Sequence, residues 1–236
     1  MELILTKKPK NVKIIEGFPG FGLVGTIATE YLINHLECEL IGRYWFEELP
    51  ATIAVHQSKI VQPIGIYYNK QYNIVIIHSI AAALGIEWKA AKIVLKVAKY
   101  LSAKEIISLE GVGNPQKEED EGRIYFYSNK EKTKEILRTN KLTEMKEGII
   151  MGITSALMVM CKKPLTCFFA ETHTNLPDSK AAAKIVEVLD KYLKLKVEIG
   201  PLMEQAQKFE QKLRGILKQG INAQKQKQEK SLSYVG

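Results

Sequence analysis

A turn with four glycines joins an apolar strand-type run to an apolar helix-type run, and this feature constrains the fold more than any other. Residues 12–25 read VKIIEGFPGFGLVG, and the segment LVGTIATEYLINHL follows without a break. The glycines of the turn are Gly17, Gly20, Gly22 and Gly25. Because glycine lacks Cβ, these positions let the backbone turn sharply and let the helix pack close to the strand. We therefore expect a compact strand–turn–helix unit here.

The last three glycines also match G-x-G-x-x-G, the pattern with which dinucleotide-binding proteins hold a pyrophosphate at a helix N-terminus. In that fingerprint the strand runs straight into the first glycine, whereas EGFP intervenes here. Pro19 pushes Phe18 toward an extended conformation, and Phe18 and Phe21 stand where phosphates need open backbone. We interpret the turn as structural. The alternative is a nucleotide- or phosphate-binding enzyme that uses residues 17–25.

Strand-type and helix-type segments alternate along the chain. The expected strands are residues 12–16, 40–46, 60–68, 74–78, 106–110, 123–127 and 165–170. The expected helices are residues 23–36, 87–101, 149–160 and 178–193. Several strands are nearly continuous in Val, Ile, Phe and Tyr, as strands buried on both faces are. The alternation predicts an α/β fold, a three-layer α/β/α sandwich with a mostly parallel central sheet.

The composition changes after the last expected helix, which predicts two parts. Residues 1–196 would form the α/β/α core domain, and residues 197–236 a C-terminal helical extension with a flexible tail. Residues 201–219 read as one amphipathic helix with an apolar stripe. The stripe consists of Leu202, Ala206, Phe209, Leu213, Ile216 and Leu217. The polar, low-complexity stretch after Gly220 cannot bury enough surface to order itself.

Composition and charge exclude several classes of protein. The 236 residues are 46% hydrophobic, and no segment reaches the 18 uninterrupted apolar residues of a membrane span. The first ten residues have too short an apolar part for a signal peptide. The formal net charge is +8, with many lysines near the C-terminus, but arginine clusters and interleaved aromatics are missing there. We expect a cytoplasmic protein with no nucleic-acid and no membrane partner.

Residues that carry catalytic or metal chemistry are scattered. Ser79 has no G-x-S-x-G elbow around it. The three cysteines lack the paired spacing of a zinc site or a disulfide framework and suggest a reducing compartment. A metal site needs several converging ligands, and the four histidines stand singly at His35, His56, His78 and His173. We expect no metal, no cofactor and no catalysis.

Three glutamates form a better constellation. Glu16, Glu110 and Glu171 each end an expected strand and open the turns EGFPG, EGVGNP and ETHTNLPD. The carboxyl ends of parallel strands gather at one edge of a sheet, where ligand crevices form. The three glutamates and the four glycines therefore predict a candidate crevice. Its carboxylates could do acid–base work or hold a cation, but the interpretation we favour is that they accept hydrogen bonds from turn N–H groups.

The same turns resemble the PAC2 family. The resemblance covers residues 12–193 and rests on EGFPGFGLVGTIATEYL, LEGVGNP, GIIMGITSALM and FAETHTNLPDSKAAAKIVEVL in this order. That family includes archaeal and eukaryotic proteasome assembly chaperones and bacterial proteins of unassigned activity. The resemblance implies an α/β/α sandwich similar to purine nucleoside phosphorylases, an added C-terminal helical part, homo-oligomers in the archaeal members, and no known catalysis.

Chaperones of this family often end in hydrophobic–Tyr–any, a sequence that inserts between proteasome α subunits. Here Tyr234 is third from last, and Ser233 precedes it where a hydrophobic residue is expected. The resemblance predicts a non-enzymatic, homo-oligomeric chaperone that binds proteasome α subunits through its C-terminal tails. A second alternative is an adaptor or chaperone for a non-proteasomal client. The candidate partner-binding residues are Leu232, Tyr234, Val235 and Gly236.

Overall fold

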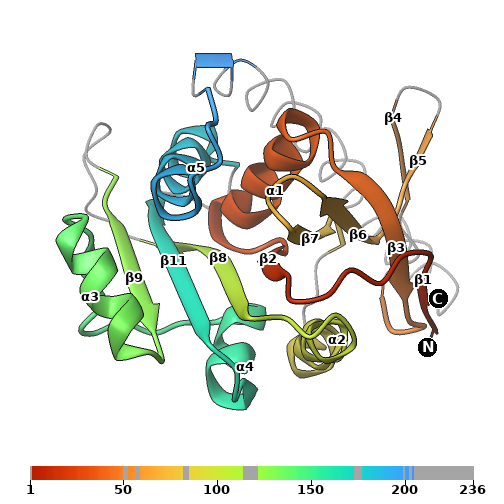
Figure 1. Ribbon diagram of the computed structural model, residues 1–236, viewed down its shortest axis with the longest axis horizontal. Coiled ribbons are helices and arrows are strands. Elements are labelled where there is room, and N and C mark those ends of the chain that lie inside the picture. Colours follow the sequence, from red (N-terminus) through yellow and green to blue (C-terminus); the bar gives the residue numbers. More distant parts are fainter. Residues whose placement is uncertain are drawn as a thin grey trace, which may run out of the picture.

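A computed structural model of the protein describes residues 2–49, 53–56, 59–81, 85–113, 122–172, 177–198, 200–201 and 204. These residues build a nine-stranded sheet with helices on both faces and a separate two-stranded hairpin (Figure 1). The expected helix at residues 201–219, apart from Pro201 and Glu204, lies outside the described residues. So do the tail and the candidate partner-binding residues Leu232, Tyr234, Val235 and Gly236.

Helices separate runs of one to five strands along the chain. The strands are β1 (Glu2–Leu5), β2 (Lys13–Gly17), β3 (Glu39–Trp45), β4 (Ala54–His56), β5 (Lys59–Val61), β6 (Ile64–Asn69), β7 (Ile74–Ser79), β8 (Glu105–Gly113), β9 (Ile124–Ser128), β10 (Thr143–Glu144) and β11 (Leu165–Thr172). The helices are the 3-10 helix η1 (Phe21–Leu23) and α1 (Val24–His35), α2 (Glu87–Tyr100), α3 (Glu131–Thr139), α4 (Gly152–Met160) and α5 (Ser179–Leu193).

The sheet is parallel in its middle and antiparallel toward both sides. Its strand order is β1-β3-β6-β7-β2-β8-β11-β9-β10. The central strands β7, β2, β8 and β11 run parallel. The pairs β1–β3, β3–β6, β6–β7 and β11–β9 are antiparallel. The α/β class is therefore confirmed, but the sheet as a whole is mixed, because antiparallel pairs extend it on both sides of its parallel centre.

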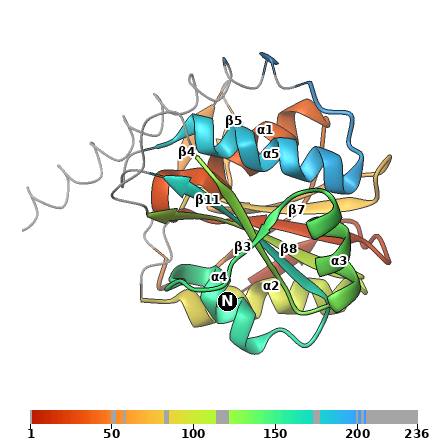
Figure 2. The same cartoon turned by 90° about the vertical axis from the view of Figure 1, so that its left-hand side faces the viewer.

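Helices α1 and α5 cover one face of the sheet, and α2 and α4 cover the other (Figure 2). Each face carries its own apolar core. One core combines α1 and α5 residues with Ile15, Ile107 and Phe168 of the central strands. The other combines α2 and α4 residues with Ile14, Ile106 and Phe169. Alternate residues of the same strands thus serve both layers, which is why these strands carry apolar residues on both faces.

Glycine backbone contacts hold the first helix against the sheet. A Cβ at Gly25 would lie 2.5 Å from the carbonyl oxygen of Leu109, and a Cβ at Gly17 would overlap the backbone of Gly25. At both positions only glycine leaves room for α1 to pack on β2 and β8. The helix thus lies as close to the strand as the glycine turn predicted.

Several boundaries differ from those expected. The single strand expected at residues 60–68 is two strands, β5 and β6, separated at Pro63, which has no N–H to donate to a ladder. The helix expected from residue 149 begins at Gly152, because Met151 is extended with φ −115° and ψ 175°. Strand β8 continues past Glu110 to Gly113. Strand β1 and helix α3 were not expected.

Candidate functional site

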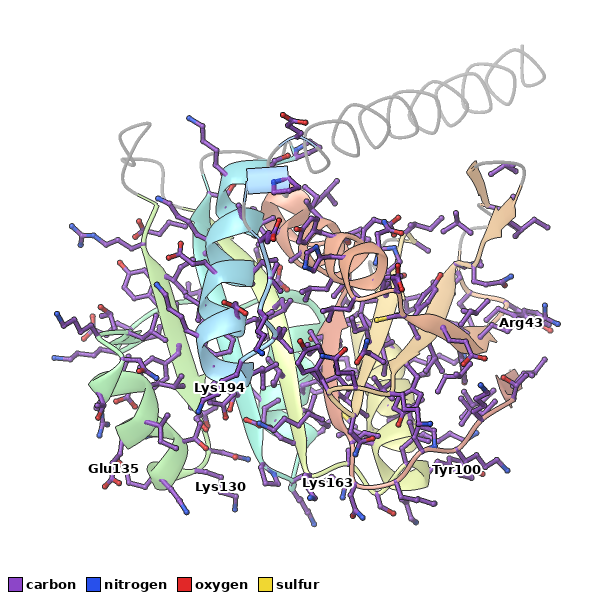
Figure 3. The ribbon with its side chains drawn as sticks, turned by 45° about the horizontal axis from the view of Figure 1, so that its top comes forward. Arg43, Tyr100, Lys130, Glu135, Lys163 and Lys194 are labelled. Atoms are coloured by element: carbon purple, nitrogen blue, oxygen red, sulfur yellow. The ribbon has the colours of Figure 1, made fainter. Side chains whose placement is uncertain are left out.

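The three glutamates of the candidate crevice lie at one end of the sheet and on one face of it. Glu16 is opposite Ser108 in the β2–β8 register, and Glu110 is opposite Phe169 in the β8–β11 register. Since side chains alternate between faces, Glu16, Glu110 and Glu171 all point to the layer of α2 and α4. The strands β2, β8 and β11 begin at the opposite end of the sheet. Tyr100, Lys130 and Lys163 mark that end in Figure 3.

These glutamates are buried rather than exposed in an open crevice. Glu16 is 1% exposed, Glu110 9% and Glu171 7%. Carboxyl groups are rarely this buried unless they are paired or hydrogen-bonded. Their hydrogen-bond partners therefore decide what the site can do.

Two hydroxyl groups connect Glu16 to Glu110. Ser108 Oγ lies within hydrogen-bonding reach of Glu16 Oε1, and Thr154 Oγ1 lies 2.7 Å from Ser108 Oγ and 3.2 Å from Glu110 Oε2. Ser108 is on β8 and Thr154 is in the first turn of α4. We call Glu16, Ser108, Thr154 and Glu110 the carboxyl–hydroxyl row.

Glu110 also binds the glycine turn. Its carboxylate accepts hydrogen bonds from the backbone N–H groups of Phe21 and Gly111, the latter at 3.2 Å. A Cβ at Gly20 would overlap Glu110 Oε1. The carboxyl group of Glu110 therefore rests directly on the turn, as the favoured interpretation of this residue expected. Glu16 does not follow that interpretation, because its carboxyl accepts a hydrogen bond from the Ser108 hydroxyl.

Burial raises the pKa values of both carboxyl groups in the row. Loss of hydration raises the pKa of Glu16 to about 7, although the hydrogen bond from Ser108 opposes the shift. Loss of hydration and repulsion by Glu16 raise the pKa of Glu110 to about 8, against the hydrogen bonds that it accepts. Groups with such pKa values at neutral pH are candidates for proton exchange.

Glu171 belongs to a separate set of contacts. It accepts hydrogen bonds from the hydroxyl of Tyr125 in β9 at 2.8 Å and from the backbone N–H of Arg123, just before β9, at 3.2 Å. These bonds tie β11 to the antiparallel strand beside it. Thus the structure joins Glu16 and Glu110 in one row and engages Glu171 with the neighbouring strand.

The position of Glu110 bears on the nucleotide alternative. In the dinucleotide fingerprint the phosphates approach the glycines and the N–H groups at the start of the helix. Here the carboxyl of Glu110 lies against Gly20 and takes the N–H of Phe21. A phosphate could occupy this place only by displacing Glu110. The geometry therefore disfavours phosphate binding at Gly17, Gly20, Gly22 and Gly25.

A Thr–His–Glu arrangement on the opposite face has the order of a catalytic triad but no access to a substrate. His78 Nδ1 lies 2.9 Å from Thr29 Oγ1, and its Nε2 lies 3.2 Å from Glu30 Oε2. Thr29 and His78 are fully buried, and the Thr29 hydroxyl already donates to Gly25 O. Burial lowers the pKa of His78, partly opposed by Glu30. We read this arrangement as internal support for α1.

Within the described ranges, no group of three or more His, Cys, Asp or Glu residues is placed to hold a metal ion. In the same part of the chain, no helix combines the length and apolarity needed to cross a membrane. Both findings concern the described residues alone, and His173 and the C-terminal tail lie outside them.

Sequence reasoning identified Glu16 and Glu110 but missed Ser108 and Thr154. Both are buried hydroxyl residues within apolar segments, IISLEG and GITSALM. A lone polar residue in a buried run needs a hydrogen-bond partner, and that signal could have drawn attention to them. Their pairing could not be foreseen, because 92 positions separate Ser108 from Glu16 and 46 separate it from Thr154.

Comparison with known proteins finds relatives that match nearly the whole chain. The sequence model of the PAC2 family matches residues 14–217. An uncharacterized protein of Methanocaldococcus jannaschii is 26% identical over 229 residues, which cover 96% of this chain and 94% of that protein. The match thus extends over nearly the full length of both chains.

Two solved structures are informative. PbaA of Pyrococcus furiosus, described as an archaeal homolog of proteasome-assembly chaperone, has a TM-score of 0.82 at 29% identity and covers 94% of this chain and 99% of its own. PbaB of the same organism, described as an archaeal proteasome activator, has a TM-score of 0.74 at 20% identity, with 91% and 98% covered. The second likeness is one of fold alone.

Proposed function

Because the chain belongs to the PAC2 family, we propose that it is a non-enzymatic chaperone that assists proteasome assembly. The observation that carries this proposal is the similarity to PbaA, at 29% identity over 94% of this chain. The nucleotide-enzyme alternative has less support, because Glu110 lies where a phosphate would have to bind.

The proposal includes a homo-oligomeric platform. The segment at residues 149–160 carries apolar side chains that the fold leaves exposed: Ile149 is 90% exposed, Met151 56% and Val159 74%. Ile153, Ala156 and Leu157 of the same segment are buried. Single exposed apolar residues are ordinary, but several in one short segment support a contact with a second copy.

The client would be held by the C-terminal tails. Tyr234 is the anchor-like side chain of the polar stretch at residues 222–236. A buried tyrosine can dominate the affinity of such a contact. Several tails on one oligomer would raise the affinity further through effective concentration. Leu232, Tyr234, Val235 and Gly236 are therefore the proposed partner-binding residues, with proteasome α subunits as the partner.

A pull-down of proteasome α subunits from a lysate tests this proposal. The full-length protein should recover them, and the protein lacking residues 232–236 should not. Equal recovery by both would show that the folded body carries recognition. Recovery by neither would refute the proteasomal client and favour an adaptor or chaperone for another protein.

A further inference from the structure

The carboxyl–hydroxyl row contains more hydrogen bonds than its hydroxyl groups can donate. Three contacts join the four groups: Glu16 to Ser108, Ser108 to Thr154 at 2.7 Å, and Thr154 to Glu110 at 3.2 Å. Each hydrogen bond needs one hydrogen, and each hydroxyl carries only one. Two hydroxyls therefore supply two of the three hydrogens. The third must come from a carboxyl group.

The alternative with two ionised carboxylates conflicts with the geometry. Ser108 would donate to Glu16 and Thr154 would donate to Glu110. The two hydroxyl oxygens would then face each other at 2.7 Å with no hydrogen between them, which is a hydrogen-bonding distance for an O–H donor and an oxygen acceptor. With one protonated carboxyl, every contact is satisfied in either direction along the row.

We propose that Glu16 and Glu110 share a single proton through Ser108 and Thr154, and that this proton locks the glycine turn to the start of α4. The proton can reside at either end, because reversing both hydroxyls converts one arrangement into the other. Loss of the proton leaves two negative charges in a buried row and opens the lock. The row is thus a pH-sensitive device within the fold.

The locking action follows from the position of Glu110. One carboxyl oxygen touches Gly20, and the carboxyl accepts the N–H of Phe21 in the turn. The other oxygen accepts the Thr154 hydroxyl and lies 3.3 Å from where a Cβ at Gly152 would be. This one side chain therefore contacts both the turn and the start of α4. Glu110 is the more exposed of the two carboxyls. When both carboxyls are ionised, an outward movement of Glu110 toward solvent therefore reduces the repulsion between them.

The groups that face the row from neighbouring elements do not neutralise a second charge. Cys167 of β11 lies on the same face, and burial together with the charges of Glu16, Cys161 and Glu110 holds its pKa well above the usual value. Burial also raises the pKa of Cys161 at the end of α4. Both thiols therefore remain neutral. Glu171, another carboxyl on this face, contacts Tyr125 of β9.

Within the described ranges, the other neighbouring elements also provide no cation. Helix α4 and η1 contain no ionisable residue, and the α2 residues turned to the core are apolar. β7 places Ile77 opposite Glu16, while its His78 binds Thr29 on the other face. Among the described residues, neither Glu16 nor Glu110 forms an ion pair with a lysine, arginine or histidine.

The pH dependence has a definite sign. An unfolded glutamate releases its proton near about pH 4.3, whereas the row keeps at least one proton to higher pH. Between these points the folded chain holds at least one more proton than the unfolded chain, so its stability falls as pH rises. The unfolding equilibrium constant therefore gains about tenfold for each pH unit from this proton. The effect is absent below the unfolded pKa and levels off once the row is deprotonated.

Glu110→Gln tests the proton count. The glutamine amide supplies the third hydrogen permanently to Thr154, and its oxygen can still accept the N–H of Phe21. Denaturant unfolding between about pH 5 and pH 8 gives the unfolding equilibrium constant at each pH. In the variant this constant should rise less steeply with pH than in the unmodified protein, by up to about tenfold per pH unit. Glu16→Gln should act in the same way from the other end. Glu135→Gln, on the exposed side of α3, provides the reference for removal of a carboxyl outside the row.

Infrared spectroscopy of the unmodified protein tests the shared proton without relying on a variant. The carbonyl stretch of a protonated carboxylic acid should be present at pH 7 and disappear toward about pH 10. Amide hydrogen exchange, corrected for intrinsic rates, tests the lock. Protection of the amides of residues 20–25 and 152–156 should fall over the pH range in which the band disappears. The Glu110→Gln variant should keep this protection over the same pH range. Absence of the band at pH 7, or equal pH slopes for the unmodified protein and the Glu110→Gln variant, would overturn the shared proton. Unchanged protection would overturn the lock.

Discussion

Replacing Gly22 with alanine measures how tightly the glycine turn is fitted to the sheet. Gly22 has φ +62° and ψ 7°, a left-handed conformation that costs other residues about 1–2 kcal/mol. A Cβ there would lie 2.6 Å from Thr172 Oγ1 and 3.1 Å from Thr172 Cβ. Thr172 is fully buried at the end of β11, so overpacking adds about 1–3 kcal/mol. The reduced entropy of the unfolded chain returns about 0.4–1 kcal/mol. The net loss of stability should be about 2–4 kcal/mol.

Two other glycines separate the contributions. Gly85 also has positive φ, +78°, but a Cβ there meets nothing within 4 Å. Gly85→Ala should therefore show the backbone strain alone, a net loss of about 1 kcal/mol. Gly113 has open space and no positive φ, so Gly113→Ala should be neutral or stabilise by up to about 1 kcal/mol. Gly22→Ala thus combines backbone strain with a steric clash, Gly85→Ala has backbone strain alone, and Gly113→Ala has neither.

Urea denaturation, checked by thermal melting, gives the free energies. A loss of about 2–4 kcal/mol corresponds to a drop of about 5–15 °C in Tm for a chain of this size. Thr172→Ala removes the nearest clashing atom, so Gly22→Ala should cost less in that background. If Gly22→Ala and Gly85→Ala cost the same, the contact with Thr172 does not constrain the turn. If all three variants lie within a few tenths of a kcal/mol, the turn does not adopt this conformation.

Three further predictions concern function. A thermal-shift screen with ATP, NAD and nucleosides should show no stabilisation, whereas a ligand at 100 times its Kd would add about 2.7 kcal/mol. Deletion of residues 232–236 should abolish recovery of proteasome α subunits and leave the melting temperature and oligomer unchanged; a lowered melting temperature would mean that the tail supports the fold. Val159→Glu should weaken the oligomer in sedimentation at micromolar concentration, since Val159 is 74% exposed on α4; a protein that is monomeric without the change would refute the oligomeric platform.

The alternation of strands and helices could be predicted because the central strands are buried on both faces. Each of them is a largely apolar run, and the helices between them show their own apolar periodicity. The outer parts were harder to predict. β1 is four residues long and β10 two, and α3 buries only Leu137. Such elements depend on their neighbours in space, so their sequences carry little signal of their own.

The candidate site could be predicted by position but not by connection. Strand ends in a parallel sheet meet at one edge, and this rule placed Glu16 and Glu110 together. Which hydroxyl reaches which carboxyl depends on the register of β2 with β8 and on the start of α4 at Gly152. Neither is encoded locally. The expected helix start at residue 149 would have placed Thr154 in the second turn rather than the first.

The four motifs behind the family resemblance meet in space around the glycine turn. EGFPGFG contributes Phe21, whose N–H is bound by Glu110 of LEGVGNP. GITSALM contributes Thr154 to the same carboxyl. The last motif, FAETHTNLPD, contributes Thr172, whose side chain packs against Gly22. The N–H of Asp178 in the same motif donates a hydrogen bond to Gly22 O at 2.8 Å.

This convergence explains why the turn matches a phosphate-binding pattern without favouring a phosphate. Glycines before a helix leave backbone N–H groups that need an acceptor. In dinucleotide-binding proteins a pyrophosphate provides it, and here the Glu110 carboxyl does so from within the chain. The match to G-x-G-x-x-G therefore reflects a shared requirement of the backbone. A ligand with phosphate groups would have to break the bonds of Glu110 to both the turn and Thr154, which is the physical reason to expect a negative result in the nucleotide screen.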